Sequence, residues 1–167
     1  MLAILLLAFG IGSRLLAHAP NFTPIISLAL FSGVYLPRRY ALWLPLVLMI
    51  LSDLMIELHD TIFFTWGSVL LITAIGLWVK NHKNFGTILG ANVVAAILFF
   101  LITNFGAWLS LYPHTMEGLK NCYVLAIPFF RNTFFSTMLY SVILFGSFEF
   151  IALRVKKTRW ARVLLAA

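Results

Sequence analysis

The sequence predicts an all-α polytopic membrane protein whose six transmembrane helices form one bundle. Of its 167 residues, 62% are hydrophobic and only 10% are charged, and the mean hydropathy is +1.01. A soluble domain of this size needs more charge to cover its surface, whereas about 20 consecutive apolar residues suffice to cross a bilayer. The basic residues also fall in short clusters between apolar runs, as in the loops of a membrane protein.

Six apolar runs can be separated by local signals. Pro20 and Pro24 bracket the first connection, because proline cannot continue the helical hydrogen-bond ladder. The second run ends at Pro37, and the fourth ends in a short basic segment that begins at Lys80. The second run is short, so it is expected either to tilt little or to lie partly buried among its neighbours. The expected spans are 2–17, 23–37, 41–58, 61–79, 85–110 and 132–153.

These spans form a single domain, residues 1–155, followed by a basic cytoplasmic tail, residues 156–167. The first run is expected to remain as a span rather than to be removed as a signal peptide. No basic residue precedes it, and Arg14 lies where a signal peptide should still be apolar.

The distribution of lysine and arginine predicts the orientation. In a six-span chain, nine of the twelve fall on one side and three on the other. Because positive residues accumulate in cytoplasmic loops, both termini should lie in the cytoplasm. The net charge of +7 therefore indicates topology and not nucleic-acid binding. The nine are Arg38, Arg39, Lys80, Lys83, Arg154, Lys156, Lys157, Arg159 and Arg162, and the three are Arg14, Lys120 and Arg131.

Carboxylates gather toward the outer end of the third span. Asp53 and Glu57 lie one helical turn apart, with Asp60 three residues later, so they form a stripe on one face. A carboxylate facing lipid costs roughly 2.5–3.5 kcal/mol, so the stripe should face the bundle interior or an outer cavity. Ligand recognition or a cation site is one interpretation. In the other, Asp53 pairs with Arg14 or Arg131 and Asp60 caps the fourth span.

Arg131 and Asn132 interrupt an apolar run at the start of the sixth span. Glu149 follows Arg131 by 18 residues, which is roughly 27 Å along a helix and close to the hydrocarbon thickness of about 30 Å. Arg131 is therefore expected at the outer boundary. There it either binds an anionic group or extends toward the lipid headgroups.

The outer connection before the sixth span is unusually apolar from Leu119 to Phe130. We expect a segment broken by Pro128 that either covers an outer site or lies on the membrane surface. Catalytic and nucleotide-binding motifs are absent, and the histidines lack metal-ligand spacing. Neither an enzyme nor a cofactor is therefore expected. The single cysteine, Cys122, excludes an internal disulfide.

Four stretches together resemble a family of small, uncharacterised bacterial six-span membrane proteins. That family in turn is similar to the substrate-binding S components of energy-coupling-factor vitamin transporters. The stretches are Arg14-Leu-Leu-Ala-His-Ala-Pro-Asn-Phe-Thr-Pro24, Leu51-Ser-Asp-Leu54, Leu101-Ile-Thr-Asn-Phe-Gly106 and Ile127-Pro-Phe-Phe-Arg-Asn-Thr133.

The resemblance implies a bacterial inner-membrane protein that binds a vitamin or similar micronutrient from outside. It also implies docking to a separate energising module through small residues, here Ala8 and Gly12. The matching outer positions are Asn21, Asp53, Asn104, Arg131 and Asn132, beside the residue-derived candidate Glu57.

Two other functions stay open: an accessory or assembly subunit without a ligand of its own, and an intramembrane enzyme using Asp53 and Glu57. An uptake protein predicts a closed outer cavity lined by Asp53, Asn104 and Arg131. An accessory subunit predicts paired charges without a cavity.

Overall fold

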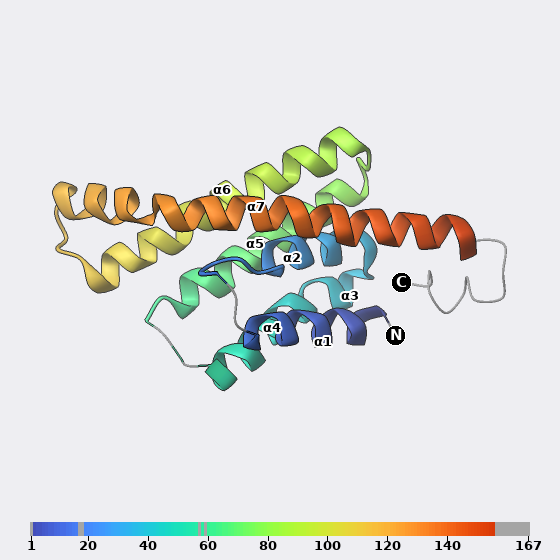
Figure 1. Cartoon of the computed structure of the whole chain (residues 1–167), viewed down its shortest axis with the longest axis horizontal. Helices are drawn as coiled ribbons and strands as arrows, with labels where there is room; N and C mark the ends of the chain where they lie inside the picture. The colour runs from blue at the N-terminus through green and yellow to red at the C-terminus, as the bar shows by residue number, and fades with distance from the viewer. Residues whose placement is uncertain (1, 17–18, 57, 59, 156–167) are drawn as a thin grey trace.

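The computed structural model describes residues 2–16, 19–56, 58 and 60–155, and all its regular elements are helices. Successive long helices run in opposite directions, so α1 begins and α7 ends at the same end of the bundle (Figure 1). The elements are α1 (Leu2–Leu15), α2 (Ile25–Tyr35), α3 (Arg38–Ala41), α4 (Trp43–Ile56), α5 (Ile62–Lys80), α6 (Phe85–Leu111) and α7 (Met116–Val155).

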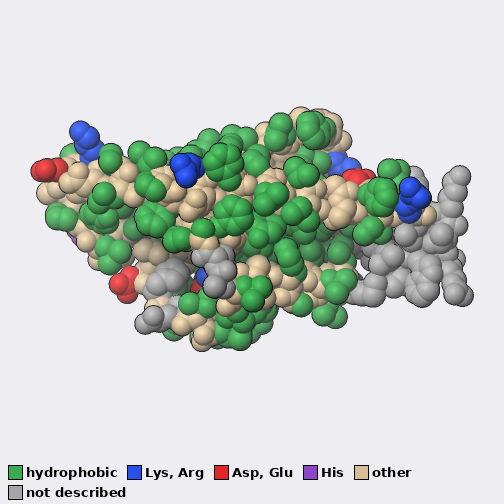
Figure 2. Space-filling model, in the orientation of Figure 1, with side chains coloured by type: hydrophobic (Ala, Val, Ile, Leu, Met, Phe, Trp, Pro, Cys, Tyr) green, Lys and Arg blue, Asp and Glu red, His purple; other side chains and the backbone are tan. Residues whose placement is uncertain are grey.

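The bundle is that of a multi-pass membrane protein. Helices α5, α6 and α7 and the joined run Arg38–Ile56 are each long and apolar enough to cross a membrane. Helix α3 is a single turn leading into α4, so the described residues form six principal helices, as expected from the apolar runs. On the face shown in Figure 2, hydrophobic side chains cover most of the surface and charged side chains are few.

Helix α2 occupies the centre of the bundle. Its residues 25–34 are all buried, and Figure 1 shows it enclosed by longer helices. With 11 residues it is only about 16 Å long. A helix that is surrounded by other helices and does not face lipid can be this short. Of the two alternatives for the short second run, little tilt or partial burial, the structure therefore supports burial.

Helix α2 approaches α5 closely at two glycines. A Cβ atom added to Gly33 would lie 2.4 Å from the carbonyl oxygen of Thr73 on α5. One added to Gly76 would lie equally close to the carbonyl oxygen of Leu30. Only glycine permits this backbone contact, which is how small residues bring membrane helices together.

The predicted start of the sixth span was wrong. Helix α7 begins at Met116 instead of residue 132 and continues through Pro128 as one helix of 40 residues, about 60 Å long. Proline is tolerated within membrane helices where neighbouring groups compensate for its missing N–H. Here the apolar segment before it packs on α6: Cys122 Sγ donates to the carbonyl of Asn104 (3.3 Å) and Tyr123 Oη to that of Leu101 (2.7 Å). The expected break at Pro128 is absent.

Candidate functional site

A cavity of about 530 Å³ opens at one end of the bundle, the end that the charge distribution predicts to be outer. This volume lies within the range of about 300–1,000 Å³ that is typical of small-molecule sites. The last turn of α1, the start of α2, the end of α4, the start of α5, the second half of α6 and the middle of α7 all contribute side chains. The lining residues are Arg14, Asn21, Thr23, Ile25, Ile26, Met49, Ile56, Thr61, Thr65, Phe99, Phe100, Thr103, Asn104, Ala107, Phe129 and Thr133.

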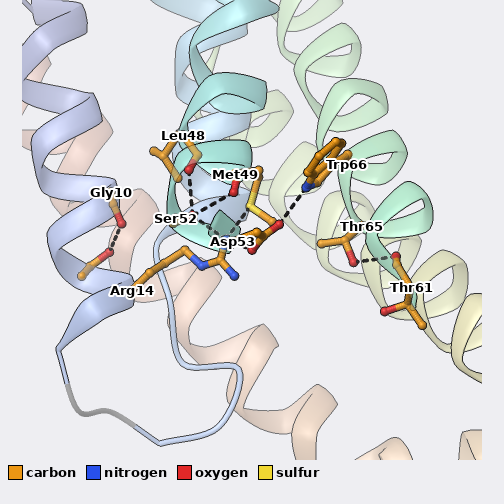
Figure 3. Close-up of polar contacts among 10 residues, drawn as sticks. Gly10, Arg14, Leu48, Met49, Ser52, Asp53, Thr61, Thr65 and Trp66 are labelled. Atoms are coloured by element: carbon orange, nitrogen blue, oxygen red, sulfur yellow. Dashed lines mark hydrogen bonds and ion pairs between the residues drawn. The ribbon is translucent and has the colours of Figure 1, made fainter. Parts of the chain in front are cut away.

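Arg14 is held at the edge of this cavity by an ion pair with Asp53 (Figure 3). Its Nη1 lies 2.7 Å from Asp53 Oδ1, and it also donates to Ser52 Oγ at 2.6 Å. The other carboxylate oxygen, Oδ2, accepts a hydrogen bond from Trp66 Nε1 at 2.7 Å. The Asp53 side chain is 1% exposed and that of Arg14 is 16% exposed. The carboxylate is thus buried and compensated, as burial of a charge requires.

Three threonine hydroxyls form part of the polar lining on α5, α6 and α7. Each donates its proton to the backbone carbonyl four residues earlier: Thr65 at 3.1 Å, Thr103 at 2.7 Å and Thr133 at 3.0 Å. The amide of Asn104 does likewise, with Nδ2 donating to the carbonyl of Phe100 at 2.8 Å. These side chains are therefore fixed in position by their own helices.

The connection between α1 and α2 closes one side of the site. Asn21 lines the cavity and has a φ of 60°, in the left-handed region that asparagine tolerates better than most residues. On α7, Asn132 Nδ2 donates to the carbonyl of Pro20 at 3.0 Å and so ties this connection to the bundle.

The structure brings some of the predicted site residues together and separates others. Asn21 and Asn104 line the cavity, whereas Asp53 lies beside it in the pair with Arg14. Asn132 holds the α1–α2 connection, and Arg131 is exposed and absent from the lining. The placement of Arg131 gives no support to a role at the cavity wall. Glu57 lies outside the described residues.

The small residues predicted for docking lie on the outside of α1. Ala8 is exposed, and a Cβ added to Gly12 would meet nothing within 4 Å. Gly10, between them, is the residue that packs inward, since a Cβ there would lie 2.1 Å from Leu48 Cδ1.

A second polar cluster lies at the opposite, basic end of the bundle. Lys83 Nζ lies 2.7 Å from Glu149 Oε1, and the hydroxyl of Tyr35 donates to the same oxygen. This cluster connects α2, the α5–α6 turn and α7. Beside it, between α6 and α7, lies a second cavity of about 450 Å³ with a mostly apolar lining. Within the residues that the structure describes, no group of three or more His, Cys, Asp or Glu could hold a metal ion.

Sequence reasoning missed most of the cavity lining. The threonines and the phenylalanines Phe99, Phe100 and Phe129 are ordinary residues in an apolar span, and each threonine is separated from the others in sequence. The position of polar residues along each span was informative. Because successive helices run in opposite directions, polar residues of several spans are expected at the same end of the bundle. Trp66, which orients Asp53, gave no signal of this kind.

Comparison with known proteins places the chain among relatives whose function is not established. Residues 1–160 match the model of a family of unknown function, DUF6580. The chain belongs to this family. No curated protein matches the chain, and no solved structure does. The match covers every described helix. The family has no assigned activity, so the cavity is the basis for inferring a function.

Proposed function

We propose that this protein is an integral membrane component that binds a vitamin or similar micronutrient from the outer side for uptake. The observation that carries the proposal is the cavity of about 530 Å³ at the predicted outer end, with aromatic and polar side chains from α1, α2 and α4–α7 around it. Ligand sites of small molecules have this character: a mostly apolar concavity with a few polar groups that fix orientation.

The resemblance to S components and the charge distribution support the orientation and the partner that we propose. With nine basic residues on one side and three on the other, the cavity faces the outside of a bacterial inner membrane and both termini lie inside. The exposed face of Ala8 and Gly12 is available for a separate energising module.

We favour binding over catalysis because of the state of Asp53. A general base must be able to reach a substrate proton, but this carboxylate is 1% exposed and both its oxygens are engaged, by Arg14 and Trp66.

An accessory or assembly subunit is the second candidate. The Arg14–Asp53 pair favours it, because paired charges are what a purely structural role predicts. The two candidates differ in whether the cavity takes a ligand.

A screen of water-soluble vitamins and their precursors on purified protein tests the proposal. Heat-induced aggregation is followed by size-exclusion chromatography. A true ligand at about 100 times its Kd should stabilise the folded protein by about 2.7 kcal/mol. Stabilisation by none of the compounds would count against uptake and in favour of the accessory role.

Matched variants show whether a stabilising compound occupies the cavity. Ala107→Phe places a ring in the cavity, and Ala74→Phe places one on the exposed side of α5. Ala107→Phe should lose the stabilisation and Ala74→Phe should keep it. Arg131→Ala should also keep it, because that side chain is exposed and outside the lining.

A further inference from the structure

The charge of the cavity limits what it can bind. Arg14 is the only charged residue among the described residues that line it, and its charge is matched by Asp53 at 2.7 Å. An anionic ligand would therefore add an unmatched negative charge, and a cationic ligand an unmatched positive one. Burying an unpaired charge away from water is costly.

The hydrogen-bonding groups of the cavity are also unevenly distributed. A hydroxyl has one proton and two acceptor lone pairs. Thr65, Thr103 and Thr133 have already committed their protons to backbone carbonyls, so each can offer only an acceptor oxygen to a ligand. Asn104 keeps its Oδ1 as a further acceptor. The wall formed by α5, α6 and α7 is thus rich in acceptors.

Donors come from the opposite side. The three contacts of the Arg14 guanidinium all use Nη1, which forms the ion pair with Asp53 and donates to Ser52 and Met49. Within the part of the chain that the structure describes, Nε and Nη2 donate to no other residue, and Arg14 lines the cavity. Its planar fork can therefore donate to a carbonyl or ring nitrogen of a ligand.

The aromatic lining adds a preference for flat molecules. Phe99, Phe100 and Phe129 come from α6 and α7 and lie on the acceptor-rich side. Phe100 is itself fixed by Phe130, with ring centroids 4.7 Å apart. Rigid aromatic faces pack against a planar ring at little cost in conformational entropy.

We propose that the ligand is an uncharged, planar heterocycle that carries N–H or O–H donors along one edge and a carbonyl or ring nitrogen at the other. The donors face Thr65, Thr103, Thr133 and Asn104, and the acceptor faces Arg14. This assignment rests on the proposed function, because it names the class of compound that the same cavity takes up.

Compounds that share a ring but differ in charge test the assignment. Riboflavin is compared with riboflavin 5′-phosphate, and nicotinamide with nicotinate, while thiamine supplies a cation. Each is added to the purified full-length protein, and the aggregation temperature is measured as a function of concentration. We expect an uncharged member to stabilise the protein at a concentration at least tenfold lower than its anionic counterpart or thiamine.

Conservative variants test the acceptor wall. Thr103→Val and Thr133→Val keep the side-chain shape but remove the oxygen, and each should weaken binding of the uncharged compound by roughly two- to tenfold. Thr73→Val is the matched control. Thr73 is fully buried, donates to the carbonyl of Val69 in the same manner, and lies outside the cavity. It should leave binding unchanged.

The outcomes separate the two proposals. Preference for the anions or for thiamine, or equal losses in Thr73→Val and the two cavity variants, overturns the uncharged, donor-bearing assignment and leaves uptake intact. Failure of all five compounds and of the wider vitamin screen overturns uptake, and the assignment with it. Preference for the uncharged compounds, lost selectively in the cavity variants, supports both.

Discussion

Replacing Arg14 with methionine removes the cation that compensates Asp53 while keeping much of the side-chain volume. Asp53 is 1% exposed, so its carboxylate would stay buried with Trp66 as its remaining side-chain partner. Removing one member of a buried pair costs roughly 3–5 kcal/mol. For a chain of 167 residues we expect the melting temperature to fall by roughly 10 °C, at about 2–4 °C per kcal/mol.

The reverse change should cost less. Asp53→Asn removes the buried negative charge and keeps an oxygen that can accept from Trp66. Arg14 is 16% exposed at the cavity, so water can solvate the cation left behind, and we expect a loss of about 1–2 kcal/mol. The double variant should be only slightly less stable than Asp53→Asn alone. This gives a coupling energy of roughly 2.5–4.5 kcal/mol, at or above the upper end of the range for residues in contact.

The cycle can be measured with a thiol-reactive fluorogenic dye. Cys122 is the only cysteine and is 2% exposed, so the dye reacts when the α6–α7 contact opens. If the stability losses of the two single variants simply add in the double variant, the view that Arg14 compensates the buried charge of Asp53 is refuted. An Arg14→Met protein as stable as the parent would refute it as well.

Three further predictions concern the bundle. Gly33→Ala should destabilise the folded protein by about 1–3 kcal/mol, because its Cβ would lie 2.4 Å from Thr73 O. Gly12→Ala is the control, because Gly12 faces open space, and it should change the melting temperature little. Equal effects of the two substitutions would contradict the close contact at Gly33. Tyr35→Phe should cost about 1 kcal/mol, seen in the same dye melt, since it loses the bond to Glu149 and keeps the ring. In a Cys122→Ala background, a Lys120→Cys variant should react with an impermeant maleimide on intact cells, whereas a Lys83→Cys variant should react only after permeabilisation. The opposite pattern would show that the predicted topology is inverted.

The number and order of the helices could be predicted because both depend on short-range signals. Long apolar runs separated by prolines and basic clusters specify six helices whatever their neighbours are, and four of these helices are long enough to cross a membrane. The start of α7 could not be predicted in this way. Pro128 normally indicates a break, and only the packing of Cys122 and Tyr123 on α6 shows how the helix continues through it.

The candidate site was predicted in part for the same reason. Topology alone predicts that polar residues of different spans gather at one end, and Asn21 and Asn104 do line the same cavity. Which of two arginines pairs with Asp53 depends on the rotation of each helix about its axis, which the sequence leaves open. The structure selects Arg14 and leaves Arg131 exposed.

The burial of α2 has a consequence for how the protein enters the membrane. A translocating chain is expected to halt where about 20 apolar residues occur together, and α2 has only 11. Its tightest partner, α5, is made later, because Gly76 follows Gly33 by more than 40 residues. Helix α2 therefore lacks its main packing partner until α5 has been made. Substitutions at either glycine should consequently lower the amount of correctly inserted protein in cells, in addition to the stability of what is purified.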